Sequence, residues 1–119
     1  MRQPARRPEQ VAGTIRQVIT EALSREIRDP RVGFVTVTGV LVTNDLSHAR
    51  VAVSVGGDEA EKARALQGLQ SAAGFLRSRA ARALTTRTVP ELHFELDKGV
   101  EHAARIEELL ESIRREEQG

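Results

Sequence analysis

Hydrophobic residues recur at helical spacing near the start of the chain. Seven apolar residues, from Val11 to Ile27, fall on one side of a helix, and the opposite side is polar. Pro8 opens this segment, and the helix should stop at Asp29, because a residue that precedes a proline disfavours helical angles. The pattern therefore predicts a first amphipathic helix with one buried face.

The next segments have the pattern of β-strands. The stretch VGFVTVTGVLVT is rich in β-branched residues, and its apolar phase switches across Gly39, which indicates a β-bulge. After the turn-forming cluster TNDLS, residues 49–55 alternate between apolar and polar, so these two strands should form a hairpin. A third strand is predicted in ELHFELD, which follows Pro90.

A long helical pattern that contains a glycine separates the second and third strands. Asp58 and Glu61 have the spacing of a capping box at its start. The apolar stripe then crosses Gly74 without interruption, but Phe75 points away from the centre of that stripe. A bend near Gly74 would bury Phe75, gaining roughly 1.5–3 kcal/mol against roughly 0.5–1 kcal/mol for the glycine. The alternative is a straight helix in which Gly74 makes room for a neighbouring element.

A last amphipathic helix is predicted from Val100 onward, with apolar residues on one side through Ile113. The predicted order is helix, strand, strand, helix, bend, helix, strand, helix. This order predicts an α+β fold in which helices cover one face of a three-stranded sheet. We expect a single domain over residues 1–119, with an ordered core over about 8–115.

The composition limits the class of protein. The 119 residues are 39% hydrophobic and 29% charged, and no apolar run approaches the roughly 20 residues that span a bilayer. The N-terminus has no apolar stretch of the kind found in a secretory signal. Because the chain has no cysteine, disulfides and thiolate metal ligands are excluded. We expect a cytoplasmic protein with no membrane association and no cofactor.

Charge is distributed unevenly along the chain. Residues 1–33 carry seven arginines against four acidic residues, and residues 71–90 carry four arginines and no acidic residue. Residues 91–119 carry four basic residues against nine acidic ones. A local field depends on where charges lie, so the two basic segments are candidates for contact with an anionic partner such as nucleic acid. Solvated helix faces, together with codon bias toward arginine, are the alternative explanation.

Three stretches carry a family resemblance: IRDPRVGFVTVTGV, then NDLSHARVAVSV, then AAGFLR followed by VPELHFELD. In this order and at these spacings the chain resembles bacterial ribosome-binding factor A along nearly its whole length. The resemblance implies a type-II KH fold in which an Ala-x-Gly kink replaces the usual Gly-x-x-G loop. In this sequence the kink corresponds to Ala72, Ala73 and Gly74, and no Gly-x-x-G occurs.

The resemblance also implies a function. It predicts a non-enzymatic assembly factor, expected to be monomeric, that binds the small ribosomal subunit. Ribosomal RNA is the expected contact, with ribosomal proteins as further candidates. Such a factor assists late subunit maturation and rRNA processing and is important in cold adaptation.

Arginines are the candidate RNA-binding residues, since a guanidinium pairs with phosphate through two hydrogen bonds and gives salt-dependent affinity with little base specificity. The three phenylalanines, Phe34, Phe75 and Phe94, are predicted to lie in the core, which argues against a platform for stacking single-stranded bases. A structured rRNA surface is therefore favoured. The candidates lie at the ends of the first helix and around the second basic segment: Arg6, Arg7, Arg28, Arg31, Arg77, Arg79, Arg82 and Arg87.

No catalytic or metal site is predicted. His48, His93 and His102 are scattered without the spacing of a ligand set, and His93 is expected to face solvent from the third strand. Asp29 and Asp45 are interpreted as cap and turn residues rather than as an acid–base pair. A hydrolase or nuclease is therefore disfavoured.

Two other functions stay open at this point. One is a general KH-like module that binds RNA or DNA and has no link to the ribosome. The other is an adaptor that binds a protein through the acidic last helix. Binding to short single strands would favour the first, and binding that does not depend on salt would favour the second.

Overall fold

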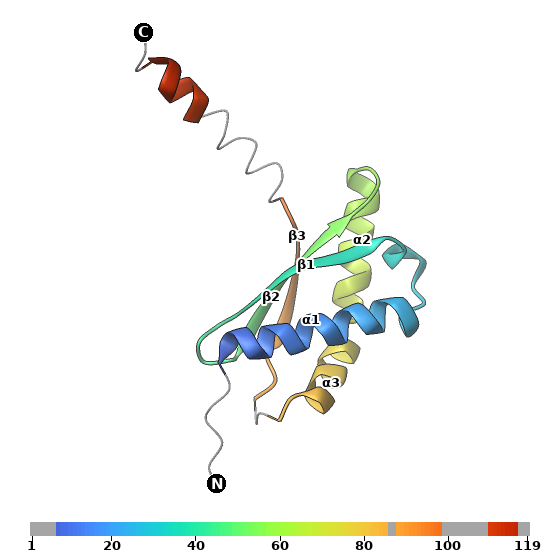
Figure 1. Cartoon of the computed structure of the whole chain (residues 1–119). Coiled ribbons are helices and arrows are strands. Elements are labelled where there is room, and N and C mark those ends of the chain that lie inside the picture. The colour runs from blue at the N-terminus through green and yellow to red at the C-terminus, as the bar shows by residue number, and fades with distance from the viewer. Residues whose placement is uncertain (1–6, 86–87, 99–109, 117–119) are drawn as a thin grey trace.

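The structure is a computed structural model that describes residues 7–85, 88–98 and 110–116. Figure 1 shows α1 running along the sheet and α2 and α3 meeting at a bend. Residues 110–116 are also helical, and the rest of the predicted last helix, with Val100, lies outside the described residues. The elements, in chain order, are α1 (Pro8–Arg25), η1 (Pro30–Val32), β1 (Val35–Val42), β2 (His48–Val55), α2 (Glu59–Ser71), α3 (Ala73–Ala83) and β3 (Glu91–Leu96).

The three strands form one mixed sheet in the order β1-β2-β3. β1 and β2 pair antiparallel as the predicted hairpin, and β2 and β3 pair parallel with His48 opposite Glu91. The register of the hairpin shifts between Val37 and Gly39, which confirms the predicted bulge. The extra residue returns Val40 to the side of the sheet that packs against the core.

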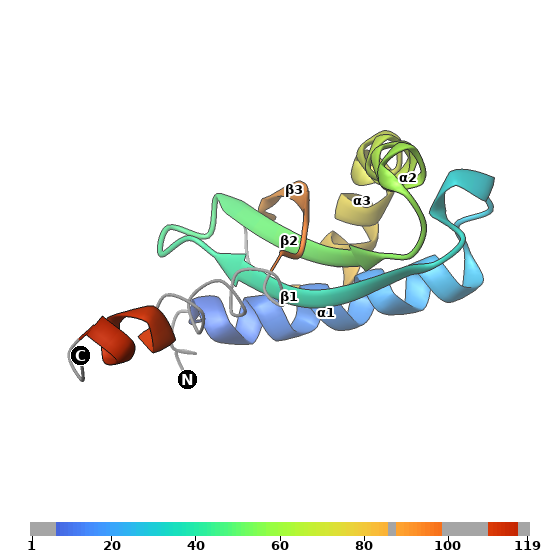
Figure 2. The ribbon, with the colours of Figure 1, turned by 90° about the horizontal axis from the view of Figure 1, so that it is seen from above.

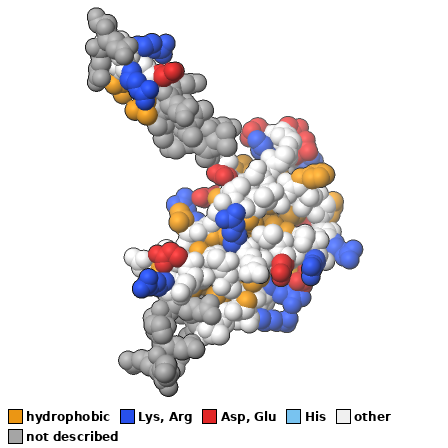
Figure 3. Space-filling view, in the orientation of Figure 1, with side chains coloured by type: hydrophobic (Ala, Val, Ile, Leu, Met, Phe, Trp, Pro, Cys, Tyr) orange, Lys and Arg blue, Asp and Glu red, His pale blue; other side chains and the backbone are white. Residues whose placement is uncertain are grey.

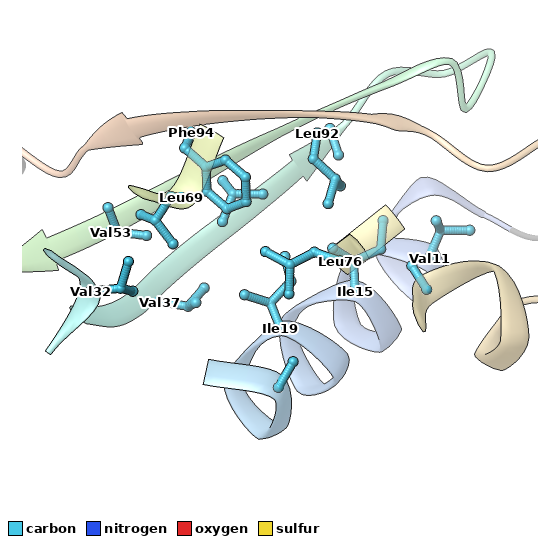
Figure 4. Close-up of a cluster of buried hydrophobic side chains, with 14 of the residues drawn as sticks. Val11, Ile15, Ile19, Val32, Val37, Val53, Leu69, Leu76, Leu92 and Phe94 are labelled. Carbon is cyan, nitrogen blue, oxygen red and sulfur yellow. The ribbon is translucent and has the colours of Figure 1, made fainter. Parts of the chain in front are cut away.

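The helices share a core with one face of the sheet, as predicted. Alternate residues of β2 are fully buried, and those between them are wholly or partly exposed. Figure 2 shows α1 lying alongside β1, and Figure 4 shows the side chains that meet between the layers. These buried side chains come from α1, η1, α2, α3 and the three strands and include Val11, Ile15, Ile19, Val32, Val37, Val53, Leu69, Leu76, Leu92 and Phe94. None of the described helices is both long enough and apolar enough to span a bilayer.

The start of α1 follows the sequence signals, but its end does not. Pro8 occupies the first turn, where its missing amide donor costs nothing. The helix ends at Arg25, four residues before the predicted limit at Asp29. The backbone amides of Glu26 and Ile27 both donate to the carbonyl of Ala22, at 2.8 and 2.9 Å, so the regular hydrogen-bond ladder is lost before Pro30 acts.

The helical segment after β2 begins and breaks as expected. The Asp58 carboxylate accepts a hydrogen bond from the amide of Glu61 at 2.8 Å, and the Glu61 side chain accepts from the amide of Asp58 at 3.4 Å, so the predicted capping box is confirmed. The helix is interrupted at Ala72, whose backbone angles of −88° and −3° separate α2 from α3. An interruption inside the predicted Ala-x-Gly segment is therefore confirmed.

Gly74 itself does not fit either interpretation given to it. A Cβ atom built on Gly74 would meet nothing within 4 Å, so the glycine makes no room for a neighbouring element. The break also lies two residues earlier, at Ala72, and the bend leaves Phe75 43% exposed instead of burying it. The prediction that the bend buries Phe75 is wrong.

The glycine at which two elements approach closely is Gly68, which is buried in α2. A Cβ atom at this position would lie 2.6 Å from Cγ2 of Val32 and 3.3 Å from Cβ of Arg31. Both contacts belong to η1, so the missing side chain lets this short helix sit directly against α2. The position of η1 in turn sets where Arg31 and Phe34 emerge from the core.

The turn between β1 and β2 is organised by Asp45. Its carboxylate accepts hydrogen bonds from the Thr43 hydroxyl at 2.7 Å and from the Ser47 hydroxyl and amide at 2.6 and 3.1 Å. These bonds lower the pKa of Asp45 from 3.8 to about 2. Leu46, at the next position, has a φ of 62°, a left-handed conformation that these neighbouring bonds help to hold. The interpretation of Asp45 as a turn residue is confirmed.

This turn predicts a specific acid dependence of stability. Because the folded pKa of Asp45 is depressed, its contribution is present above the unfolded pKa near 3.8 and is lost as pH falls through about 2. Urea unfolding between pH 4.5 and pH 2 should show wild type losing more stability than Asp45→Asn, which lacks the titrating group. Parallel pH profiles for the two proteins would show that the turn does not stabilise the charged carboxylate.

Candidate nucleic-acid interface

Basic side chains lie over several parts of the surface, and one group of them lies where α1 ends beside α3. Figure 3 shows Lys and Arg side chains over the end of α1 and beside α3, with acidic side chains among them. α1 and α3 contact one another directly, and η1 packs on α2, so the two basic segments of the sequence lie close together in the fold. Of the eight arginine candidates, Arg6 and Arg87 lie outside the described residues.

Arg31 is held by the residue that caps its own short helix. Asp29 accepts a hydrogen bond from the amide of Arg31 at 2.9 Å, and its carboxylate forms an ion pair with the guanidinium at 2.6 Å. These contacts lower the pKa of the Asp29 carboxyl and raise that of Arg31. Asp29 is thus a cap, as predicted. Arg31 is exposed, but its guanidinium already has a carboxylate partner.

Arg79 makes more contacts within the protein than Arg31 does. Its guanidinium forms an ion pair with Glu26, just beyond the end of α1, and lies 5.3 Å from the centre of the Phe75 ring. About a third of each charged side chain is exposed, at 35% and 33%. The buried Nε atom of Arg79 has no hydrogen-bond partner among the residues that the structure describes. Arg79 therefore joins α3 to α1 and is poorly placed to release its charge to a phosphate.

This arrangement predicts that Arg79 is structural. A double-mutant cycle with Arg79→Met and Glu26→Gln should give a coupling energy of about 0.5–1 kcal/mol, the size expected for a partly exposed pair. Arg79→Met alone should leave affinity for an anionic partner nearly unchanged. Chemical denaturation and a binding assay on the same proteins measure both effects. A large loss of affinity with no coupling would assign Arg79 to the interface instead.

Arg77 faces the opposite side of α3 and supports the sheet. Its Nη2 and Nε atoms donate to the backbone carbonyl of Val89 at 2.9 and 3.3 Å. This contact ties α3 to the segment that leads into β3. Arg77 is exposed and keeps its net charge, but a substitution there also removes hydrogen bonds to the backbone.

Three of the candidate arginines form no ion pair within the described part of the chain. Arg7, Arg28 and Arg82 are exposed, and no described acidic residue forms an ion pair with them. Arg82 lines a hollow between α1 and α3 together with Glu21 and Arg79. Exposed guanidiniums without a carboxylate partner are the groups most able to bind phosphate oxygens. Arg25 and Arg64 are exposed in the same way and were not among the predicted RNA-binding candidates.

The aromatic residues do not all lie where the sequence predicted. Phe94 is buried at 7% exposure, as expected, but Phe34 is 87% exposed and Phe75 is 43% exposed. Phe34 lies in the loop between η1 and β1 and lines a hollow with Arg31 and Arg64. The prediction that all three rings are in the core is therefore wrong for two of them, and the argument against base stacking loses its premise.

Two histidines that look scattered in the sequence lie together in the fold. His48 and His93 occupy adjacent strands, with Nδ1 of the first 3.0 Å from Nε2 of the second. Both are exposed, which confirms that His93 faces solvent. The description of the histidines as scattered is wrong for this pair, because parallel pairing of β2 with β3 joins residues 45 positions apart. His102 lies outside the described residues.

Comparison with known proteins identifies the family. The family model described as ribosome-binding factor A matches residues 7–110. This chain belongs to the ribosome-binding factor A family. A curated Ribosome-binding factor A from Thermomicrobium roseum is 47% identical over 115 residues, covering 97% of this chain and 89% of the relative.

Solved structures of the family share the fold. A solution structure of a Thermotoga maritima protein is 35% identical and has a TM-score of 0.70, covering 83% of this chain and 94% of that protein. A model of the Thermus thermophilus ribosome binding factor A, fitted into the cryo-EM map of a 30S complex, is 26% identical with a TM-score of 0.59. The match covers 72% of this chain and 90% of the Thermus thermophilus chain. The α+β fold with a three-stranded sheet is thus the family fold, and the interruption at Ala72 is consistent with the KH-like arrangement.

Proposed function

We propose that this chain binds the small ribosomal subunit in the cytoplasm and assists its late maturation and rRNA processing without itself catalysing a reaction. The observation that carries the proposal is family membership over residues 7–110, together with exposed, unpaired arginines where α1 and α3 meet. The Thermus thermophilus relative fitted into a 30S complex supports the same partner. We also propose that residues 1–119 act as one monomeric domain, with importance in the cold.

The chemistry of the basic end supports contact with the RNA backbone. Arg28 and Arg82 carry charges that no described carboxylate neutralises, whereas Arg31 and Arg79 are paired within the protein. Phosphate contacts made by such residues fix orientation and supply salt-dependent affinity without reading sequence. We therefore assign the phosphate-binding role first to Arg28 and Arg82 at this end and to Arg7 at the opposite end of α1, and only second to Arg31, Arg77 and Arg79.

A non-catalytic role is supported by what the candidate acidic groups do. Asp29 and Asp45 are used as a helix cap and a turn residue, and each carboxylate is satisfied by hydrogen bonds from neighbours two residues away. A general base instead needs a free lone pair aimed at a reacting group. Arg31 occupies both oxygens of Asp29, and Oδ1 of Asp45 already accepts three hydrogen bonds within its own turn.

The exposure of Phe34 favours a second candidate function. A phenylalanine that is 87% exposed beside two arginines has the features of a site where a single-stranded base can stack. A general single-strand RNA-binding module is therefore the alternative to a ribosome-specific factor. The two differ in the preferred partner and in whether a base stacks on Phe34.

Sedimentation separates these functions. The purified chain should co-sediment with small subunits and not with large subunits, and an excess of short single-stranded RNA should displace little of it. Deleting the gene should cause precursor small-subunit rRNA to accumulate, most strongly in the cold. Displacement by short single strands, with unaltered rRNA processing in the deletion strain, would support the general module and contradict the ribosomal role.

A further inference from the structure

Two histidines and a glutamate meet on the face of the sheet that the helices leave open. His48 is the first residue of β2 and Glu91 is the first residue of β3, and the two are partners in the parallel register. His93 follows Glu91 by two residues and so projects from the same face. The amide of Glu91 donates to the carbonyl of Ser47 at 2.9 Å, which fixes the two strand starts side by side. All three side chains are exposed.

The separations between their ligand atoms are close to those of a metal site. Nδ1 of His48 lies 3.0 Å from Nε2 of His93 and 3.8 Å from Oε2 of Glu91, and one ligand atom from each residue lies within 4.8 Å of the others. Ligands bound tetrahedrally to Zn²⁺ at 2.0–2.1 Å lie about 3.3 Å apart. Small side-chain rotations on a rigid sheet would therefore bring the three atoms to bonding distance of one ion.

The contact between the two imidazole rings shows that a metal ion would replace the proton shared by their nitrogens. Two imidazole nitrogens 3.0 Å apart need one proton between them, because one ring must donate and the other accept. A metal ion in place of that proton binds a lone pair from both rings at once. Two imidazoles and one carboxylate form a donor set that suits Zn²⁺, Cu²⁺ or Ni²⁺ and does not suit Mg²⁺ or Ca²⁺.

The charge around the cluster also favours a cation. Arg50 is the register partner of His93, and an unpaired guanidinium there would repel a metal ion. Its Nη2 atom instead lies 3.0 Å from both carboxylate oxygens of Glu95, so its charge is offset locally. No Lys or Arg in the described part of the chain forms an ion pair with Glu91, which adds a negative charge at the cluster when the histidines are neutral.

We propose that His48, Glu91 and His93 form a binding site for one divalent transition-metal ion of the Zn²⁺ class. Three protein ligands leave at least one coordination position open to water or an external group. The site lies on the face of the sheet opposite the helices, whereas Arg28 follows the end of α1 and Arg82 lies on α3, so it is separate from the proposed RNA surface. It does not depend on the ribosomal role.

Calorimetric titration of the full, untagged chain with zinc chloride tests the site. We expect one ion per chain with a dissociation constant in the micromolar range, and no heat of binding from magnesium chloride. His48→Gln and His93→Gln should each weaken zinc binding at least tenfold, and Glu91→Gln should weaken it less, because an amide is a poorer ligand than a carboxylate. These positions are exposed, so circular dichroism and the unfolding midpoint should change little.

His102→Gln is the matched control, since it removes a histidine that is not assigned to the site. NMR of the histidine rings gives a second readout: zinc should shift the His48 and His93 nitrogen signals together and leave those of His102 unchanged. The proposal is overturned if zinc binds only at millimolar concentration, or if His102→Gln weakens binding as much as His48→Gln does. Neither result would bear on whether the chain binds small subunits.

Discussion

Replacing Gly68 with alanine should destabilise the fold by up to about 2 kcal/mol, although alanine is the better helix former. The new Cβ would lie 2.6 Å from Cγ2 of Val32, which is buried and stiff at χ1. Overpacking of this kind costs about 1–3 kcal/mol, while the gain in helix propensity is about 1 kcal/mol. Urea unfolding followed by circular dichroism measures the net effect.

Gly74→Ala is the matched control for this prediction. The same substitution there places Cβ in open space within α3, so it should leave stability unchanged or raise it by up to about 1 kcal/mol. The two variants should therefore differ by about 2 kcal/mol. Equal stabilities, or a larger loss at Gly74, would contradict the conclusion that η1 packs closely against α2 at Gly68.

Reversing the charge of two unpaired arginines should have the largest effect on binding. Arg28→Glu with Arg82→Glu is expected to weaken association with the small subunit by at least a hundredfold. Each change removes a phosphate contact and adds repulsion. Because neither side chain holds a described partner, the unfolding free energy should stay within about 0.5 kcal/mol of wild type. Fluorescence binding assays with purified subunits and urea unfolding measure the two quantities.

The control makes the same change in net charge at a different place on the protein. Arg114→Glu with Arg115→Glu alters net charge by the same amount on exposed residues of the acidic C-terminal segment. This variant should bind small subunits with nearly wild-type affinity. Equal losses from the two double variants would show that net charge, and not the surface at α1 and α3, determines binding.

Local sequence patterns predicted most of the elements. Capping at Asp58, the bulge at Gly39 and the hairpin turn at Asp45 each depend on residues within a few positions of one another, so their chemistry is visible in the sequence. The α+β class followed from the order of those elements.

Features that depend on distant partners were missed for a physical reason. The ion pair between Arg79 and Glu26 joins residues 53 positions apart, and the contact of His48 with His93 joins residues 45 apart. Periodicity shows which side of a helix is apolar, but not how far the covering layer extends. Phe34 illustrates this limit: it stands in an apolar stretch yet lies just before β1, beyond the reach of the core.

The salt dependence of binding to small subunits tests the central claim most directly. If arginines at α1 and α3 contact phosphates, the logarithm of the association constant should fall linearly with the logarithm of salt concentration. The slope should be shallower by about two units for the variant with Arg28→Glu and Arg82→Glu. An association constant that does not change between 50 and 200 mM salt would contradict the account and point instead to a protein partner.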